Sequence, residues 1–216
     1  MNKDRSALAN LAHAFYRDHK KVLGLIKEDN SGSGFEPAVH RLFGSNPAPE
    51  NLVRIGKSEY IFSDLTKSQV SFLPARWRQE LDQTNGTWRG CENWWAGYPL
   101  ISFVELRAGD LDAKGYLRLN AEVGPISNLR MREAIIETIR TAASAMGLER
   151  IQFQPGASDK GRLYSRFLRR NSIALNDIAD PGEIERKFVQ LINSFEPEFE
   201  LVANVIPQFP CPNDAP

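Results

Sequence analysis

Three acidic residues in the middle of the chain, Asp64, Glu105 and Glu122, are candidates for metal-ion chemistry. Some Mg²⁺-dependent nucleases place an Asp on one strand and a Glu-x-Lys on the next, where the carboxylates bind the ion and the lysine activates water. Here Arg107 stands where that lysine would be, and an arginine does not act as a base at neutral pH. A divergent nuclease that uses Mg²⁺ is therefore the alternative hypothesis. A structural strand with an outward-facing Glu105 is the favoured one.

A basic segment spans residues 150–172, which contain six Lys or Arg residues and one acidic residue. The following residues, 173–200, contain seven acidic residues and two basic ones. Arginines gathered in this way can bind the phosphates of a nucleic acid. The alternative is that the two segments neutralise each other within the fold. The residues that we expect to contact phosphate are Arg162, Arg166, Arg169 and Arg170.

An aromatic segment runs from Trp77 to Trp95 and holds four tryptophans interleaved with arginines. Packing in the core is the favoured interpretation of this segment. Two alternatives stay open, namely contact with a protein partner and stacking on the bases of a nucleic acid. The partner hypothesis assigns the contact to Trp88, Trp94 and Trp95.

Signatures of other kinds of site are missing from the sequence. It contains no Walker A motif and no G-x-G-x-x-G, and the Gly/Ser stretch at 30–34 follows a helical pattern, which predicts a hinge. Glu36 and His40 stand four residues apart and predict a surface pair. Cys91 and Cys211 lie far apart, with no zinc-site spacing and no disulfide framework, which is typical of a cytoplasmic protein. We expect no bound cofactor.

The overall composition excludes two simple classes. Lys plus Arg and Asp plus Glu both total 27, so the chain as a whole is not a strongly basic nucleic-acid binder. The chain begins with charged residues and has no apolar run of about 18 residues, so we expect no secretory signal and no membrane span.

The spacing of apolar residues predicts one α+β domain over residues 35–206. An N-terminal helical arm within 1–30 precedes this domain, and a Pro-rich disordered tail at 207–216 follows it. Apolar and polar residues alternate over 116–123, which predicts a half-buried antiparallel strand with one wet face. We expect the strands to form an antiparallel sheet with helices packed on one side. Other strands are expected within 52–65 and at 70–73, 99–107, 151–153 and 163–168. Helices are expected at 36–43, 75–81, 127–146 and 198–206, and another helix is expected to begin at Asp180.

A run of short motifs between residues 55 and 195 resembles part of a known family. It comprises Phe72-Leu73-Pro74 followed by Trp77, the strand Ile101–Leu106, Leu117-Arg118-Leu119, Glu122-Val123-Gly124-Pro125, and a helix headed by Arg130. This run resembles the C-terminal accessory region of PD-(D/E)XK nuclease-superfamily proteins of bacteria and phages. The nuclease signature of that family lies upstream of this region and is absent here, so the resemblance transfers no catalytic residue. It implies a setting in nucleic-acid metabolism or in conflict between phage and host.

Together these features favour a non-enzymatic binding or regulatory module. Its partner would be a protein, a nucleic acid or both, and residues 3–27 offer an element for docking or for forming a homo-oligomer. The divergent nuclease with Asp64, Glu105 and Glu122 is one alternative. A purely structural or assembly protein is the other.

Overall fold

A seven-stranded antiparallel sheet forms the centre of the protein, as seen in a computed structural model that describes residues 33–84, 86–92, 97–109 and 113–211. The strands follow the order β1-β2-β3-β4-β5-β6, and β7 pairs with β5 as well. Contacts divide the chain into Met1–Ser33 and Gly34–Pro216. The expected helical arm of residues 1–30 lies outside the described residues. The strands are β1 (Leu52–Ile55), β2 (Ser58–Thr66), β3 (Gln69–Pro74), β4 (Leu100–Ala108), β5 (Gly115–Val123), β6 (Ser165–Arg166) and β7 (Ser172–Leu175).

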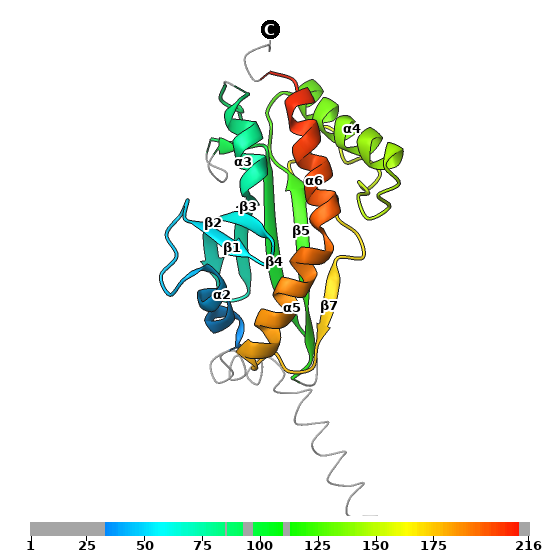
Figure 1. Cartoon of the computed structure of the whole chain (residues 1–216). Coiled ribbons are helices and arrows are strands. Elements are labelled where there is room, and N and C mark those ends of the chain that lie inside the picture. Colours follow the sequence, from blue (N-terminus) through cyan, green and yellow to red (C-terminus); the bar gives the residue numbers. More distant parts are fainter. Residues whose placement is uncertain (1–32, 85, 93–96, 110–112, 212–216) are drawn as a thin grey trace, which may run out of the picture. The chain divides into compact units, whose positions relative to one another are not determined.

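Helices lie on one side of this sheet. In Figure 1, α5 and α6 cross in front of β4 and β5, with α2 and α3 on one flank and α4 on the other. This arrangement confirms the predicted α+β class, in which an antiparallel sheet carries helices on one side. The helices are α2 (Phe35–Phe43), α3 (Ala75–Asp82), α4 (Leu129–Ala145), α5 (Pro181–Ser194), α6 (Glu196–Val205) and the short 3-10 helix η2 (Ile206–Gln208).

Local sequence signals explain where the helices near the candidate site begin. Asn128 caps α4, because its side chain accepts a hydrogen bond from the Met131 N–H at 3.1 Å. Asp180 caps α5 in the same way, because its side chain accepts a hydrogen bond from the Gly182 N–H, and Pro181 occupies the first helical position.

The strand predicted at 116–123 corresponds to β5, and its apolar residues all face the helices. They are Leu117, Leu119, Ala121 and Val123, each fully buried.

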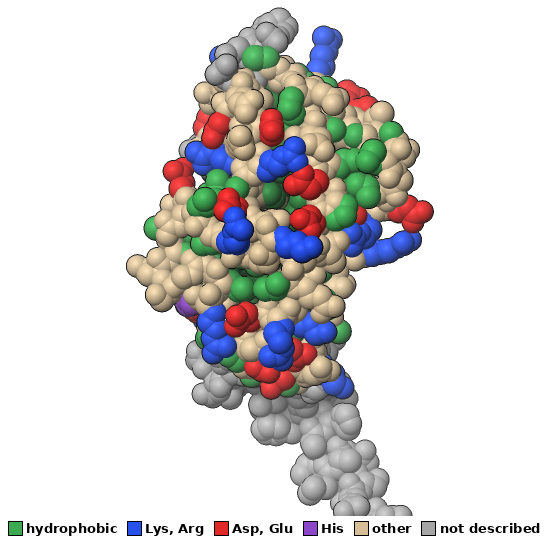
Figure 2. Space-filling model, viewed as in Figure 1, with side chains coloured by type: hydrophobic (Ala, Val, Ile, Leu, Met, Phe, Trp, Pro, Cys, Tyr) green, Lys and Arg blue, Asp and Glu red, His purple; other side chains and the backbone are tan. Residues whose placement is uncertain are grey.

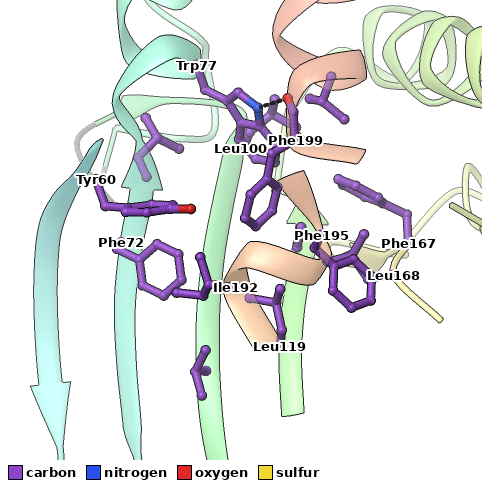
Figure 3. Packing of buried hydrophobic residues seen from close by; sticks show 14 of the residues in the cluster. Tyr60, Phe72, Trp77, Leu100, Leu119, Phe167, Leu168, Ile192, Phe195 and Phe199 are labelled. Carbon is purple, nitrogen blue, oxygen red and sulfur yellow. Dashed lines mark hydrogen bonds between the residues drawn. The ribbon is translucent and has the colours of Figure 1, made fainter. Parts of the chain in front are cut away.

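The core between the sheet and the helices is rich in aromatic residues. The rings of Tyr60 and Phe72 pack edge to face with their centroids 5.3 Å apart, and those of Trp77 and Phe199 do the same at 5.4 Å. Figure 3 shows these rings pointing toward one another from the strands, α3 and α6. The Trp77 indole N–H also donates a 2.8 Å hydrogen bond to the Phe199 carbonyl, so a large apolar side chain is buried with its polar group satisfied.

Three expectations need correction. The range 52–65 contains two strands, since Gly56 adopts a φ of 63° and turns β1 back onto β2, which holds the expected strand residues around Ile61. The predicted strand over 163–168 is reduced to the two residues of β6, with Ile151 bridged to Leu168 beside it. The tail expected to be disordered from Pro207 onward is ordered as far as Cys211. Burial of Phe209, which is 7 % exposed, outweighs the proline content there.

Candidate functional site

A cluster of three buried polar side chains and two exposed arginines occupies the sheet face opposite the apolar side chains of β5. We call Glu105, Arg107, Asn120, Glu122 and Arg166 the Glu105 cluster. Arg166 donates from Nη1 to Glu105 at 3.0 Å and from Nε to Glu122 at 3.4 Å, so its guanidinium links the two carboxylates. Asn120 Nδ2 donates to Glu105 at 2.8 Å, and Arg107 pairs with the same carboxylate. Each buried carboxylate therefore has a cationic partner.

This cluster changes the expectation of a fully wet face on β5. Asn120 and Glu122 are 3 % and 8 % exposed, because neighbouring side chains of the cluster cover them.

Burial raises the pKa of Glu122. Attraction to Arg166 opposes that shift, and repulsion from Glu105 adds to it. The net result is a pKa above the ordinary value of a glutamate.

The three carboxylates of the nuclease hypothesis do not meet at one point. Glu105 and Glu122 approach the same guanidinium, whereas Asp64 pairs with Ser71 on β3 and is exposed. Asp64 thus lies two strands from β4, a spacing of about 10 Å across the sheet. Among the residues that the structure describes, no group of three or more His, Cys, Asp or Glu side chains is arranged to hold a metal ion.

A pocket of about 370 Å³ opens beside the Glu105 cluster at the end of β6. We call it the β6 pocket. Arg162 and Arg166 bring positive charge to its wall, and Glu122 is the acidic residue among its lining side chains. Tyr164 is 48 % exposed and adds an aromatic ring to the lining. The full lining set is Glu122, Gln154, Ala157, Arg162, Tyr164, Ser165 and Arg166.

A buried arginine, Arg132 of α4, supports the pocket lining from behind. Its side chain is 1 % exposed and donates to the Ala157 carbonyl at 2.7 Å and to the Ser165 hydroxyl at 2.6 Å. A third, longer hydrogen bond reaches the Gly124 carbonyl at 3.3 Å. All three acceptors are neutral, so this buried cation has no carboxylate partner in the described part of the chain. Buried cations are normally paired with an anion, which makes this one unusual.

Arg132 and Arg162 add positive charge to the same place. Burial lowers the pKa of Arg132, and repulsion from Arg162 lowers it further, which indicates that the two guanidinium groups interact. An arginine nevertheless stays protonated in a protein. Arg162 itself is exposed and has no carboxylate partner among the described residues. Two uncompensated cations therefore lie at or directly behind the β6 pocket.

The other residues predicted to contact phosphate are placed differently. Arg170 pairs with Glu149 at 3.5 Å on a highly exposed surface, and Arg169 donates to the carbonyl of Leu168. Of the four predicted arginines, Arg162 and Arg166 thus share the β6 pocket, but Arg166 is also engaged by two carboxylates.

The basic and acidic segments do neutralise each other at one point. Arg150 donates to Glu198 at 2.8 Å and 2.6 Å, and Glu198 is 2 % exposed. On the helix-covered face, basic and acidic side chains are interspersed, and no large patch of one sign is visible in Figure 2.

The tryptophans divide between core and undescribed chain. Trp88 is 2 % exposed, so it packs in the interior in this structure and is not presented to a partner. Trp94 and Trp95 lie outside the described residues. Trp77 belongs to the core, as the favoured interpretation of this segment expects.

Arg132 is the residue that reasoning from the sequence missed. The buried stripe of α4 contains Ile136, Ile139 and Ala143, and its helical spacing extended back by one turn falls on Arg132. A charged residue on the apolar stripe of a helix is the signal that could have identified it.

Comparison with protein-family models, curated proteins and solved structures finds no match to this chain. Within the described ranges, no helix combines the length and the apolar character needed to cross a membrane.

Proposed function

We propose that this domain is a non-enzymatic binding module that contacts the phosphates of a nucleic acid through the β6 pocket. The observation that carries the proposal is the pair of guanidinium groups, Arg132 and Arg162, that have no carboxylate partner at one pocket. A phosphate would supply the missing negative charge. The biological setting proposed with it, nucleic-acid metabolism or conflict between phage and host, rests on the family resemblance alone.

Two further basic side chains of the segment 150–172 support contact with a polymer. Arg169 and Lys160 lie in the same segment as Arg162 and, among the described residues, have no carboxylate partner. Since most of the affinity of such sites comes from phosphate contacts, binding should weaken steeply with salt.

The test is a titration at several salt concentrations. Single- and double-stranded DNA and RNA of about 20 nucleotides, labelled at an internal base so that the ends stay native, are followed by fluorescence anisotropy with and without Mg²⁺. The R162A/R169A variant should bind more weakly and lower the salt slope by up to about 1.4 for a single strand. The R54A/R140A variant removes the same charge from exposed arginines elsewhere and should bind as the wild type does.

Three outcomes would overturn the proposal. Absence of binding at low salt would remove nucleic acid as the ligand and favour a protein partner. Equal losses in the two double variants would mean that overall charge, not the pocket, attracts the polymer. Cleavage that requires Mg²⁺ would restore the nuclease hypothesis.

A further inference from the structure

The charge of the β6 pocket can be counted from its ion pairs. Glu122 is balanced by Arg166, and Glu105 by Arg107 together with Arg166. Among the lining residues and Arg132, Arg162 and Arg132 then remain without a carboxylate, which leaves an excess of two positive charges in this set. A dianion would neutralise this excess, whereas a single negative charge would leave half of it.

The position of Arg132 in its helix adds to this preference. Arg132 lies in the first turn of α4, which is 17 residues long, and the first turn of a helix carries partial positive charge. Burial, the repulsion from Arg162 and the helix dipole therefore all disfavour the charge of Arg132 in the empty pocket. An anion at the pocket would interact favourably with Arg132, with Arg162 and with the positive end of α4.

The size of the pocket fits a small ligand. A volume of about 370 Å³ falls in the range of small-molecule pockets, which run from roughly 300 to 1,000 Å³. Gln154 adds a neutral amide to the lining of the pocket.

We infer that the β6 pocket binds a phosphate monoester, either the terminal phosphate of a nucleic-acid strand or that of a free nucleotide. A monoester carries about 1.5 to 2 negative charges at neutral pH, while each internal phosphodiester carries one. The monoester thus matches the charge excess of the pocket. Arg162 contacts the phosphate, and Arg132 positions the pocket lining through Ala157 and Ser165. This inference rests on the proposed function and names the ligand of the same site.

The test compares strand ends that differ in one group. Internally labelled 12-nucleotide DNA and RNA strands carry a 5′-phosphate, a 3′-phosphate or hydroxyls at both ends, and adenosine monophosphate and inorganic phosphate serve as competitors. The full-length protein should prefer one phosphorylated end by roughly 10-fold or more, as expected for charge-assisted hydrogen bonds. Competition by the mononucleotide alone would identify a free nucleotide as the ligand.

Two matched variants assign the preference to the pocket. Arg162 is exposed and makes no ion pair among the described residues, so R162A should fold normally, with a Tm no lower than that of the wild type, and lose the preference for the phosphorylated end. R162K should retain part of that preference, because lysine keeps the positive charge but lacks the paired N–H donors of the guanidinium group. R170A removes an equally exposed arginine of the same segment and should keep the full preference.

The results separate this inference from the proposed function. If strands bind with a steep salt dependence and equal affinity for phosphorylated and hydroxyl ends, the monoester inference fails and the binding module stands. If adenosine monophosphate binds through Arg162 but no strand binds, the monoester inference stands and the nucleic-acid module fails. If R170A and R162A lose the preference equally, the pocket assignment is wrong.

Discussion

Arg132 on α4 donates a 2.6 Å hydrogen bond to the hydroxyl of Ser165 on β6. That hydroxyl in turn donates to the Ala157 carbonyl at 2.7 Å, which Arg132 also binds. The guanidinium, the hydroxyl and the carbonyl thus form a closed set of hydrogen bonds within the interior. Since Ala157 and Ser165 line the β6 pocket, the shape of the pocket depends on a charge buried in the adjacent helix.

Replacing Arg132 with alanine should therefore reduce stability strongly. R132A leaves the acceptors on Gly124, Ala157 and Ser165 without their donor and opens a cavity, with an expected loss of about 3 kcal/mol or more. Urea unfolding of the purified protein measures the change. Arg130, an exposed residue in the same helical turn, provides the control, and R130A should stay within about 0.5 kcal/mol of the wild type. Equal stability of R132A and R130A would contradict the assigned role.

The raised pKa of Glu122 predicts a pH dependence of stability. The folded protein holds the Glu122 proton more tightly than the unfolded chain, so the wild type loses stability relative to E122Q as pH rises above the ordinary pKa of 4.5. The slope of this difference is at most about 1.4 kcal/mol per pH unit, the value for one proton. Below that pH the difference should be constant. Unfolding free energies at a series of pH values test this, and parallel profiles for the two proteins would refute it.

The Arg150–Glu198 pair should matter far more than the Arg170–Glu149 pair. R150A leaves the buried Glu198 carboxylate without its cation, and breaking a buried pair in this way costs about 3–5 kcal/mol. R170A breaks a pair in which both side chains are over 70 % exposed, and should change stability by less than about 1 kcal/mol. Thermal unfolding of both variants gives the comparison. Similar shifts in Tm would show that the exposed pair is stronger than its geometry indicates.

Two glycines with positive φ should respond differently to alanine. Gly90 has a φ of 96°, and a Cβ there would lie 2.1 Å from the Pro125 carbonyl oxygen, in the turn that precedes α4. Gly147 has a φ of 67° and open space around it. G147A should cost about 1 kcal/mol, the penalty of a left-handed backbone, and G90A clearly more. Chemical denaturation tests the order, and a G90A protein as stable as G147A would show that the turn can move aside.

Most of the fold prediction rested on the regular spacing of apolar residues along the sequence. Alternation over 116–123 matches β5, and the Asp180-Pro181 start matches α5, because local residue types decide these features. β7 was missed, since its four residues, Ser172–Leu175, have little pattern of their own and are held by pairing with β5. Such a strand depends on tertiary context that a single sequence does not display.

The candidate site was predicted only in part. Glu105, Glu122 and Arg166 were singled out separately, as metal ligands and as a phosphate contact, but their meeting depends on the register of three strands. Register places Arg166 opposite Glu122 and thereby converts two candidate ligands into partners of an arginine. Arg132 was missed because an arginine counts as a surface residue unless its place on the buried stripe is noticed.

The short outer strands of the sheet have a consequence for behaviour at high concentration. In the described part of the chain, β1 closes one side with four residues, and β6 and β7 share the other side with two and four. A long unpaired strand would offer a template on which another copy could add by backbone hydrogen bonding. Dividing the outer border into short pieces limits that template, so fibril growth by strand addition should start poorly from the folded domain.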